Sequence, residues 1–409
     1  MSELKQKPHL HASWIDPAAK EIVRNLQNQG FTSYLVGGCV RDLLAGVVPK
    51  DFDIATNAEP NQVRKHVRGA YVIGKRFRLV LVKRGAQQYE VATFRREMQP
   101  EDLETTEETV EAEETTAPVG DNFFGTAEQD ALRRDFTINA LFYDPIKNNL
   151  LDYAKGLPDI ESRTIRMIGD PAQRIVEDPI RSLRAIRLAH KLGFHIEGQF
   201  RENIRGLADR VALSVLPRRR EEYLKFLRLS DPLPALAELF DLELMKVLLP
   251  TLTLIWSDSE KLDAFRLYYQ ARKSLTEDAS IPIQVYLPFI FACWKALENE
   301  PNAKGLLNNL MKDELGMFKS EQAFILDAME MSSNFPAVSS FLKRGHRRRS
   351  GFLKTESLIP ALIIAEKDFL MQPSEILFWK QQLGRAFMQP FEPTSAQPSQ
   401  KVDPDQQTQ

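Results

Sequence analysis

The stretch that most constrains this chain is YLVGGCVRDLLAGVVPKDFDIAT, at residues 34–56. A first apolar run ends in the adjacent glycines Gly37 and Gly38, and a second carries two aspartates around one phenylalanine. Side chains two apart on a strand point to the same side, so Asp51 and Asp53 are expected to project together. The stretch therefore predicts a strand, a glycine turn, a short helix and a second strand that presents two carboxylates in one small volume.

The two carboxylates predict a metal site, although a DxD pair by itself is a weak motif that also occurs without function. Like charges this close repel and raise a pKa unless a cation neutralises them, and Mg²⁺ prefers such oxygen ligands. Glu90, in YEVATF, is a candidate third acidic ligand, with an exposed strand glutamate as the alternative. Because Mg²⁺ usually completes its shell with substrate phosphates, a phosphate site is expected nearby.

The glycines predict where that phosphate binds. Without a Cβ, Gly37 and Gly38 let phosphate oxygens approach backbone N–H groups at the start of the helix that runs to Leu44. Arg41, one turn into this helix, is expected to reach the same phosphates with a permanent, forked charge. A tight glycine turn alone is as often structural, and the carboxylate pair behind it is what favours a function.

The first 150 residues read as a mixed α/β module. Helices are expected over 17–29 and 60–67. Strands are expected in the apolar runs YLVGG, DFDIAT, FRLVLVKR and YEVATF. Residues 99–122 lack apolar periodicity and include the acidic run 101–114, so they predict a mobile loop inserted in this module.

Beyond this module the chain predicts almost only helices. Strand signals nearly vanish from about residue 161 to residue 385, and stretches such as RSLRAIRLAHKLGF give helix after helix. The end of the chain is rich in Gln, Pro, Ser and Asp, which predicts disorder. The expected organisation is an α/β head over 1–150, a helical neck over 151–230, a helical body and tail over 231–388, and a disordered end over 389–409.

Composition limits the class of protein without identifying a partner. The 54 basic and 56 acidic side chains give a net charge of −2, which hides local runs such as the basic KRGHRRRSGFLK at 343–354. The distant Cys39 and Cys293 offer neither a disulfide framework nor a thiolate zinc site. No apolar run approaches the roughly 18 residues of a membrane span, and the N-terminus lacks an apolar signal region. We expect a cytoplasmic protein with no membrane span.

A second motif, DALRRDFTINALFYD at 130–144, places an arginine pair before an apolar segment. Arg133 and Arg134 precede Asp135, and Asn139 lies one helical turn after that aspartate. Arginines in the same module as a metal site would offset the charge that grows on a leaving pyrophosphate. An ordinary surface cluster of ion pairs is the alternative.

A third motif, RIVEDPIRSLRAIRLAHKLGF at 174–194, predicts an amphipathic helix with arginine at every third position: Arg181, Arg184 and Arg187. Asp178 lies near the start of this helix. Because an acid accepts hydrogen bonds and an arginine donates them, Asp178 and Arg181 are suited to contact opposite edges of a nucleobase. A charge-striped, solvated helix is the alternative.

Together these motifs resemble the class II branch of the nucleotidyltransferase superfamily, which contains tRNA CCA-adding enzymes and bacterial poly(A) polymerases. The resemblance covers about residues 31–230 and implies a head with the metal site, then a helical neck, body and tail that hold RNA. It implies two Mg²⁺ ions, ATP as substrate, and RNA 3′ ends of mRNA or tRNA as acceptor. On this resemblance Asp51 and Asp53 fall on the metal-binding pair, Gly38 and Arg41 on phosphate contacts, Arg133 and Asp135 on the second head motif, and Asp178, Arg181 and Arg184 on a nucleotide-selecting helix.

The expected site follows from these motifs and the resemblance together. The catalytic set is Asp51, Asp53 and Asp135, with Asp135 completing or orienting the site. The nucleotide-binding set is Gly37, Gly38, Arg41, Arg133, Asn139, Asp178, Arg181 and Arg184.

Features outside the three motifs favour the poly(A) branch. VIGKRFRLVLVKRG at 72–85 is similar to a poly(A) polymerase signature, although Leu81 stands where that signature often has histidine. A CCA-adding enzyme would share every catalytic residue and is the nearest alternative. A non-catalytic RNA-binding protein that kept the fold is an alternative of another class. A dinucleotide binder is excluded because the glycine turn lacks GxGxxG spacing.

Two basic runs predict the path of RNA over the helical half. PRRREEYLKFL at 217–227 and the run at 343–354 offer cations for backbone phosphate, a kind of contact that depends strongly on salt and little on sequence. His346 or Phe352 could stack on a base, and packing inside the protein is the alternative.

Overall fold

The computed structural model describes residues 4–6, 10, 12–74, 79–97, 123–270, 275–276 and 278–388. The predicted loop 99–122, with its acidic run 101–114, and the predicted disordered end 389–409 lie outside the described residues. The chain divides into two compact units, Met1–Asp258 with Asn308–Gly316 and Ser259–Leu307 with Met317–Gln409. Within the described part of the chain, no helix combines the length and the apolar character needed to cross a bilayer.

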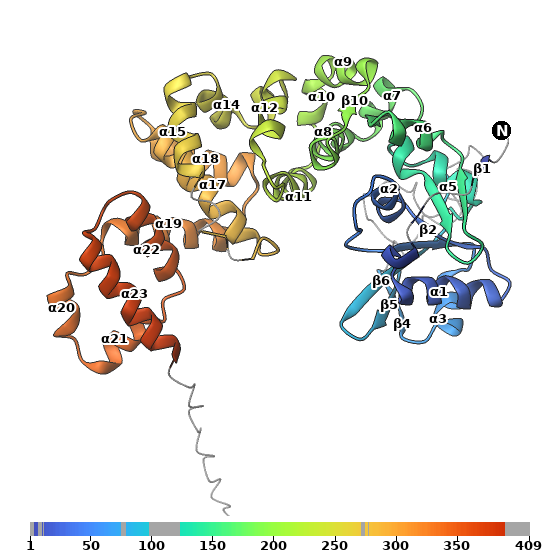
Figure 1. Cartoon of the computed structure of the whole chain (residues 1–409). Helices are drawn as coiled ribbons and strands as arrows, with labels where there is room; N and C mark the ends of the chain where they lie inside the picture. Colours follow the sequence, from blue (N-terminus) through green and yellow to red (C-terminus); the bar gives the residue numbers. More distant parts are fainter. Residues whose placement is uncertain are drawn as a thin grey trace, which may run out of the picture. The chain divides into compact units, whose positions relative to one another are not determined.

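A mixed eight-stranded sheet lies in the N-terminal part of the first unit (Figure 1). Its order is β1-β8-β7-β2-β3-β6-β5-β4; β3 and β6 pair in parallel, and the other neighbours pair antiparallel. The strands are β1 (Leu4–Gln6), β2 (Ser33–Val36), β3 (Asp53–Thr56), β4 (Ala70–Ile73), β5 (Leu79–Arg84), β6 (Gln87–Thr93), β7 (Leu141–Asp144) and β8 (Asn149–Asp152). The four predicted strands are confirmed as β2, β3, β5 and β6. The strand β4 and the β7–β8 hairpin were not predicted.

The register of this sheet brings the predicted acids to one place. Val36, the last residue of β2, pairs with Asp53, the first residue of β3. On the other side of β3, Ile54 pairs with Val91 of β6, so Glu90 is the register neighbour of Asp53. Because the glycine turn follows Val36 directly, the turn and the acids lie at the same edge of the sheet.

Three predicted helices of the head are confirmed. α1 (Pro17–Asn28) begins after Asp16, whose side chain accepts hydrogen bonds from the backbone N–H groups of Ala18 and Ala19, and it packs against β2 and β3. α2 (Gly38–Leu44) follows the glycine turn, and α3 (Pro60–His66) precedes β4. A core cluster beside the strands joins Val36, Ala55 and Phe142 of the sheet to Ala131 of α5 (Ala127–Leu132), which fixes the second motif against the sheet.

The remainder of the first unit is helical, as predicted, apart from two short strands, β9 (Thr164–Ile165) and β10 (His195–Ile196), that pair in parallel. A 3₁₀ turn, η2 (Thr137–Asn139), lies in the second motif. The π-helical turn η3 (Leu310–Glu314) packs against α14, where buried Glu314 accepts hydrogen bonds from the backbone and hydroxyl of Thr251. The helices are α6 (Gly156–Glu161), α7 (Pro171–Glu177), α8 (Ile180–Leu192), α9 (Gly198–Gly206), α10 (Ala208–Ala212), α11 (Leu216–Leu227), α12 (Leu233–Asp241), α13 (Leu244–Leu248) and α14 (Pro250–Trp256).

The second unit is built from helices around an aromatic core. Phe341 and Trp379 lie at its centre, with ring centroids 4.8 Å apart. The ring of Phe352 lies 5.9 Å from Phe341 and 5.5 Å from Trp379, so it packs inside the protein, as the alternative to base stacking proposed. The helices are α15 (Ser259–Tyr269), α17 (Pro282–Leu297), α18 (Ala303–Asn309), α19 (Lys319–Ser333), α20 (Val338–Leu342), α21 (His346–Leu353), α22 (Leu358–Lys367) and α23 (Pro373–Met388).

Candidate active site

One cavity of about 540 Å³ in the first unit brings the three sequence motifs together. It contains every predicted site residue except Asp51, and it adds Arg96, Glu97 and Arg134. Six arginines against four acids line it, so the cavity carries excess positive charge. The lining residues are Gly37, Gly38, Arg41, Asp53, Arg96, Glu97, Arg133, Arg134, Asp135, Asn139, Asp178, Arg181 and Arg184.

The glycine turn has one position that only glycine fits. Gly37 caps α2 with φ +69° and ψ −126°, a region that other residues rarely adopt. A Cβ there would lie 2.8 Å from Nη1 of Arg134, whereas a Cβ at Gly38 would meet Nη2 of Arg41 at an ordinary 3.6 Å. Gly37 is therefore required by its backbone conformation, and a side chain there would also displace the guanidinium of Arg134.

Asp53 lies in this cavity and is surrounded by charge. Partial withdrawal from water, and then the charges of Glu90 and Asp51, raise the pKa of Asp53 to about 6, against the opposing effect of Arg134 and Arg41. Asp51 is exposed like Asp53, and Phe52 between them is buried, but β3 begins only at Asp53, so Asp51 and Phe52 precede the strand on which they were predicted. Asp51 lines a different cavity, so the prediction that both carboxylates lie in one small volume is not met, although the charge of Asp51 still acts on Asp53.

The carboxylates at this edge of the sheet would supply only some of the ligands of a bound cation. Burial, and then the charges of Glu90 and Asp51, raise the pKa of Asp53, and a bound cation would oppose each of these effects. Among the described residues, no group of three or more His, Cys, Asp or Glu side chains is arranged to hold a metal by itself. This donor set suits Mg²⁺, which commonly takes one or two carboxylates and completes its shell with water and phosphate.

Arg41 reaches the cavity but is held by protein partners. Its side chain is buried; Nε and Nη2 donate to Oδ1 of Asp42 at 2.8 and 2.6 Å, and Nη1 donates to Oδ1 of Asn139 at 2.6 Å. Asp42 also accepts a hydrogen bond at 3.0 Å from Nζ of Lys191, on α8. Arg41 therefore has a fixed direction, set by Asp42 beside it in the chain and by Asn139 of the second motif.

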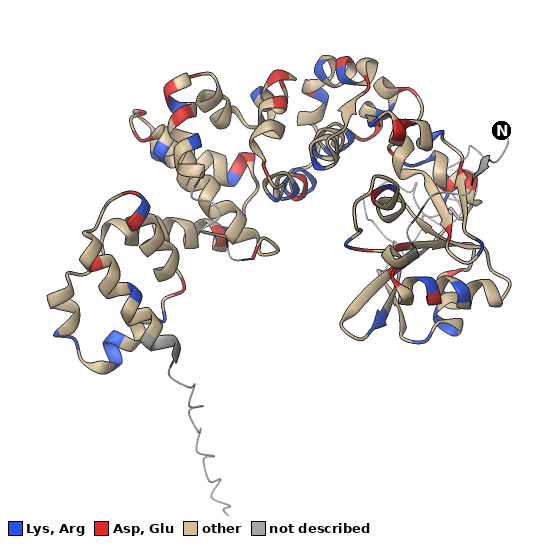
Figure 2. Cartoon of the chain, viewed as in Figure 1, with Lys and Arg blue, Asp and Glu red and all other residues tan. Residues whose placement is uncertain are grey.

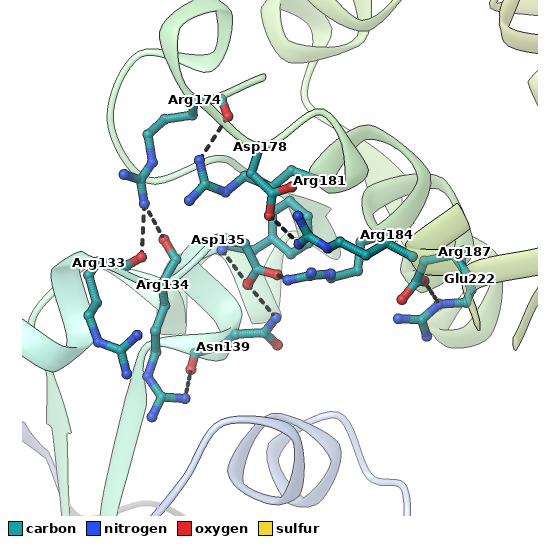
Figure 3. Close-up of polar contacts among 12 residues, drawn as sticks. Arg133, Arg134, Asp135, Asn139, Arg174, Asp178, Arg181, Arg184, Arg187 and Glu222 are labelled. Carbon is teal, nitrogen blue, oxygen red and sulfur yellow. Dashed lines mark hydrogen bonds and ion pairs between the residues drawn. The ribbon is translucent and has the colours of Figure 1, made fainter. Parts of the chain in front are cut away.

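Asp135 is also fully engaged. Its Oδ1 accepts from Nδ2 of Asn139 and from the backbone N–H of Phe136, each at 2.9 Å, and its Oδ2 accepts from Nη1 of Arg184 at 2.9 Å (Figure 3). Burial alone would raise the pKa of Asp135, but the charge of Arg184 and the hydrogen bonds of Asn139 and Arg184 hold it below its usual range. With both oxygens bound, Asp135 is placed to orient its neighbours, one of the two roles expected for it.

The sequence analysis missed Asp130, which holds the arginine pair. Asp130 is buried; its Oδ1 accepts from Nη2 of Arg133 at 2.6 Å, and its Oδ2 accepts from Nη2 of Arg134 at 2.9 Å. Arg134 also donates to the backbone O of Asn139 and lies 5.1 Å from the ring of Phe142. The i+3 and i+4 spacing from Asp130 to the arginines was the signal that could have identified this partner.

Arg174 was also missed, and it ties α7 to the second motif. Its Nη2 donates to the backbone oxygens of Arg133 and Arg134 at 2.8 and 3.2 Å (Figure 3). Its Nη1 donates to Glu97 and Glu177. No local sequence pattern predicts a contact between a side chain and a backbone oxygen 40 positions away. Arg174 fixes the chain that carries the arginine pair rather than lining the cavity.

Asp178 and Arg181 stand at the neck side of the cavity. Oδ2 of Asp178 accepts a hydrogen bond from Nη2 of Arg218 at 2.9 Å, while its buried Oδ1 has no hydrogen-bond partner among the described residues. Nη1 of Arg181 donates to the backbone O of Arg174 at 2.7 Å and to Glu177 at 3.2 Å. Arg187, next on the same helix face, pairs with Glu222 outside the cavity lining (Figure 3).

Comparisons with known proteins agree with this arrangement. Residues 33–166 match the poly A polymerase head domain, and residues 193–255 match a family described as a probable RNA and SrmB-binding site of polymerase A. Poly(A) polymerase I of Haemophilus influenzae is 38% identical over 297 residues, 71% of this chain and 65% of that protein. The chain thus spans less than two thirds of the length of the poly(A) polymerases it matches.

CCA-adding enzymes are similar as well. That of Bacillus pumilus is 38% identical over 181 residues, 44% of this chain and 42% of that protein. The solved complex of a CCA-adding enzyme with ATP shares the fold, with a TM-score of 0.59 at 18% identity, over 95% of this chain and 87% of that one.

Proposed function

This chain belongs to the class II nucleotidyltransferase superfamily, and on that premise we propose that it transfers AMP from ATP to RNA 3′ ends without a template, in the cytoplasm. In this reaction the RNA 3′ oxygen bonds to the α-phosphorus, the bond to the bridging oxygen of pyrophosphate breaks, and the hydroxyl proton is released. The observation that carries the proposal is the single cavity in which Asp53 meets arginines from motifs far apart in the chain.

Asp51 and Asp53 are the residues we assign to the cation. When bound there, Mg²⁺ would supply charge neutralisation for the triphosphate and activation of the RNA 3′ hydroxyl, with two ions expected by resemblance. Glu90 stands beside Asp53 in register and contributes to its raised pKa, which supports it as a third acidic partner.

The arginines of the cavity would receive the triphosphate. The guanidinium groups of Arg133 and Arg134 both donate hydrogen bonds to Asp130, which fixes their direction. Charge-assisted hydrogen bonds of this kind are stronger than neutral ones. Gly37 leaves room for Arg134 beside the backbone of the turn. Because these groups are fixed before substrate binds, they would stabilise the charge on the leaving pyrophosphate without reorganising.

The neck would select the base. Oδ1 of Asp178 is buried without a hydrogen-bond partner in the described structure, and Arg181 lines the same cavity, so a nucleobase that reaches them would meet an unused acceptor and a cationic donor. Asp135 positions Arg184, and Asn139 positions Arg41. We therefore assign binding of the base to Asp178 and Arg181, and orientation of the cavity to Asp135 and Asn139.

RNA would lie along the basic helices. α11 carries three successive arginines, and the first of them, Arg218, already contacts Asp178 at the cavity. Basic side chains also gather on α21 in the second unit (Figure 2). Such contacts neutralise phosphates of any sequence, which fits the addition of nucleotides to varied RNA.

CCA addition to tRNA is a second candidate. It is favoured by the solved complex of a CCA-adding enzyme with ATP, which shares the fold of nearly the whole chain. The two activities differ in the nucleotide used. A labelled short tRNA and a generic RNA, each offered single nucleotides with Mg²⁺, would give long tails from ATP alone in polyadenylation, and CTP-dependent addition followed by one A in CCA addition.

Replacing Asp53 by asparagine tests the proposal. We expect nucleotidyl transfer to fall by about a thousandfold or more, because several kcal/mol of charge stabilisation is lost while the residue keeps its shape. Asp209→Asn, on the exposed face of α10, is the matched control and should keep full activity. Retained transfer in Asp53→Asn, with circular dichroism showing the same fold, would refute the assignment.

A further inference from the structure

The strand β4 ends the eight-stranded sheet on one side (Figure 1). It pairs with β5, from Ala70 opposite Val82 to Ile73 opposite Leu79, and no described strand pairs with its outer side. The helix α3 packs against β4, β5 and β6, so it covers a face of the sheet rather than this edge. In the described part of the chain, the outer backbone groups of β4 are therefore open to an added strand.

The strand itself carries no charge. Its sequence is AYVI, and the side chains of Tyr71 and Ile73 are 56% and 43% exposed. These two residues share one face because they are two positions apart, whereas buried Ala70 lies on the other face, which α3 covers. Many edge strands carry charged residues or proline that discourage pairing, and β4 carries neither.

Cations lie beside this edge. Arg64, Lys65 and Arg68, on α3 and in the turn before β4, are exposed, and none has an ion pair among the described residues (Figure 2). Nζ of Lys83, on β5, lies 5.9 Å from the centre of the Tyr71 ring. The sequence contains no Asp or Glu between residues 60 and 84. The surroundings of the β4 edge are therefore positive.

The turn that places these cations is fixed. The backbone N–H of Lys83 donates to the backbone O of Gly69 at 3.0 Å, and the guanidinium of Arg84 donates to the backbone O of Arg68. Gly69 has φ +71°, and a Cβ there would lie 3.0 Å from the backbone O of Lys83. Glycine thus lets the turn pack against β5, which holds Arg68 next to the start of β4.

The chemistry of the edge selects an extended polypeptide. Strand addition uses backbone N–H and C=O groups in register, which RNA does not have. Because side chains alternate along a strand, an added strand would place one set beside Tyr71 and Ile73 and the other set on the face that α3 covers. Apolar side chains suit the first position, and carboxylates suit the second.

We propose that the β4 edge binds an extended acidic segment of a partner protein as an added strand. None of the residues named for this edge lines the arginine cavity, so the partner and the nucleotide have separate sites. The inference goes beyond the proposed function and does not depend on it. It gives the head domain a place to hold another protein while the cavity remains accessible.

A synthetic peptide tests the mode of binding. The probe is fluorescein-labelled EVEVEVE, and its controls are KVKVKVK and a copy of the acidic peptide that is methylated at every interior backbone nitrogen. Methylation removes the N–H groups and keeps the charges. We expect the methylated copy to bind at least about tenfold more weakly in fluorescence anisotropy, through loss of main-chain hydrogen bonds. Hydrogen exchange of residues 70–73 should slow only with the unmethylated acidic peptide.

Variants test the cations. Replacing Arg64, Lys65 and Arg68 by glutamine should weaken binding of the acidic peptide about tenfold, with nucleotidyl transfer unchanged. The matched control replaces Lys246, Lys304 and Lys319, which are exposed and have no ion pair among the described residues. It removes the same charge elsewhere and should keep the affinity.

Several results would overturn the proposal. Equal affinity for the acidic peptide and its methylated copy would show attraction by charge alone, and equal losses in the two triple variants would remove the part assigned to α3. Protection of residues 70–73 that rises with protein concentration, without peptide, would assign the edge to a second copy of this chain. Displacement of the peptide by single-stranded RNA would assign it to RNA, and no binding of the acidic peptide would leave the edge without the proposed partner.

Discussion

Arginines are closely spaced in the sequence both around the cavity of the first unit and on α21, but the two groups differ in their ion-pair partners. Asp42, Asp130 and Asp135, each buried or nearly so, bind Arg41, the pair Arg133 and Arg134, and Arg184, respectively. On α21, Arg347 and Arg348 are exposed, and neither has an ion pair among the described residues.

This difference separates a site from a surface. A guanidinium bound to a buried carboxylate keeps one direction and can recognise a group at a defined position. An exposed arginine samples many rotamers and contributes mainly its charge to nearby phosphates. Local density of basic residues therefore predicts attraction, and the buried acid behind an arginine predicts recognition.

The largest expected effect follows from removing such an acid. Asp130→Asn would leave Arg133 and Arg134 without their shared charge partner, and breaking a buried pair typically costs about 3–5 kcal/mol. We expect this loss in the free energy of unfolding from urea titration, together with a higher KM for ATP. Asp263→Asn removes the partner of Arg266 in an exposed i,i+3 pair and should cost less than about 1 kcal/mol. Equal losses in the two variants would contradict the distinction.

A smaller effect is expected from Lys191, which links α8 to Asp42 on α2. Lys191→Met removes a partly exposed ion pair while Asp42 keeps Arg41, so we expect a loss of about 1 kcal/mol in stability. Because Asp42 directs Arg41 into the cavity, we also expect KM for ATP to rise about fivefold.

Lys225→Met is the matched control for this prediction. Lys225 pairs at 2.9 Å with Glu222, a buried acid that keeps Arg187, and this cluster does not line the cavity. It should lose similar stability with no change in KM for ATP, and Lys191→Arg should restore KM. If both lysine variants leave KM unchanged, the contact is structural only.

The smallest effect on stability is expected on α21. Replacing Arg347, Arg348 and Arg349 by glutamine should change the free energy of unfolding by no more than about 0.5 kcal/mol per residue. The slope of log binding constant against log salt for single-stranded RNA should fall by up to about 2. The control triple Arg64, Lys65 and Arg68, exposed around α3, should leave the slope unchanged. If the two triples give the same slope, α21 has no special part in RNA binding.

Much of the site could be predicted from sequence because its signals are local. Alternation around Phe52, the glycine turn and the four-residue spacing of Asp135 and Asn139 all act within one or two turns of chain, and the structure contains each of them. The partners that fix the arginines were less visible. The helical spacing between Asp130 and the arginine pair could have identified Asp130 as their partner. Arg174 donates to a backbone oxygen, a contact that no pattern of side chains predicts.

The sequence by itself determined the class of fold, the edge that carries two aspartates, and the supply of arginines for an anionic substrate. Only the tertiary structure decided which acid holds which arginine, and that the two aspartates face different cavities. The bond from Arg41 to Asn139 joins residues 98 positions apart, and the bond from Lys191 to Asp42 spans 149 positions. Such partners are chosen by the packing of whole elements, because burial favours whichever charges the fold brings within hydrogen-bonding distance, and no local periodicity records that choice.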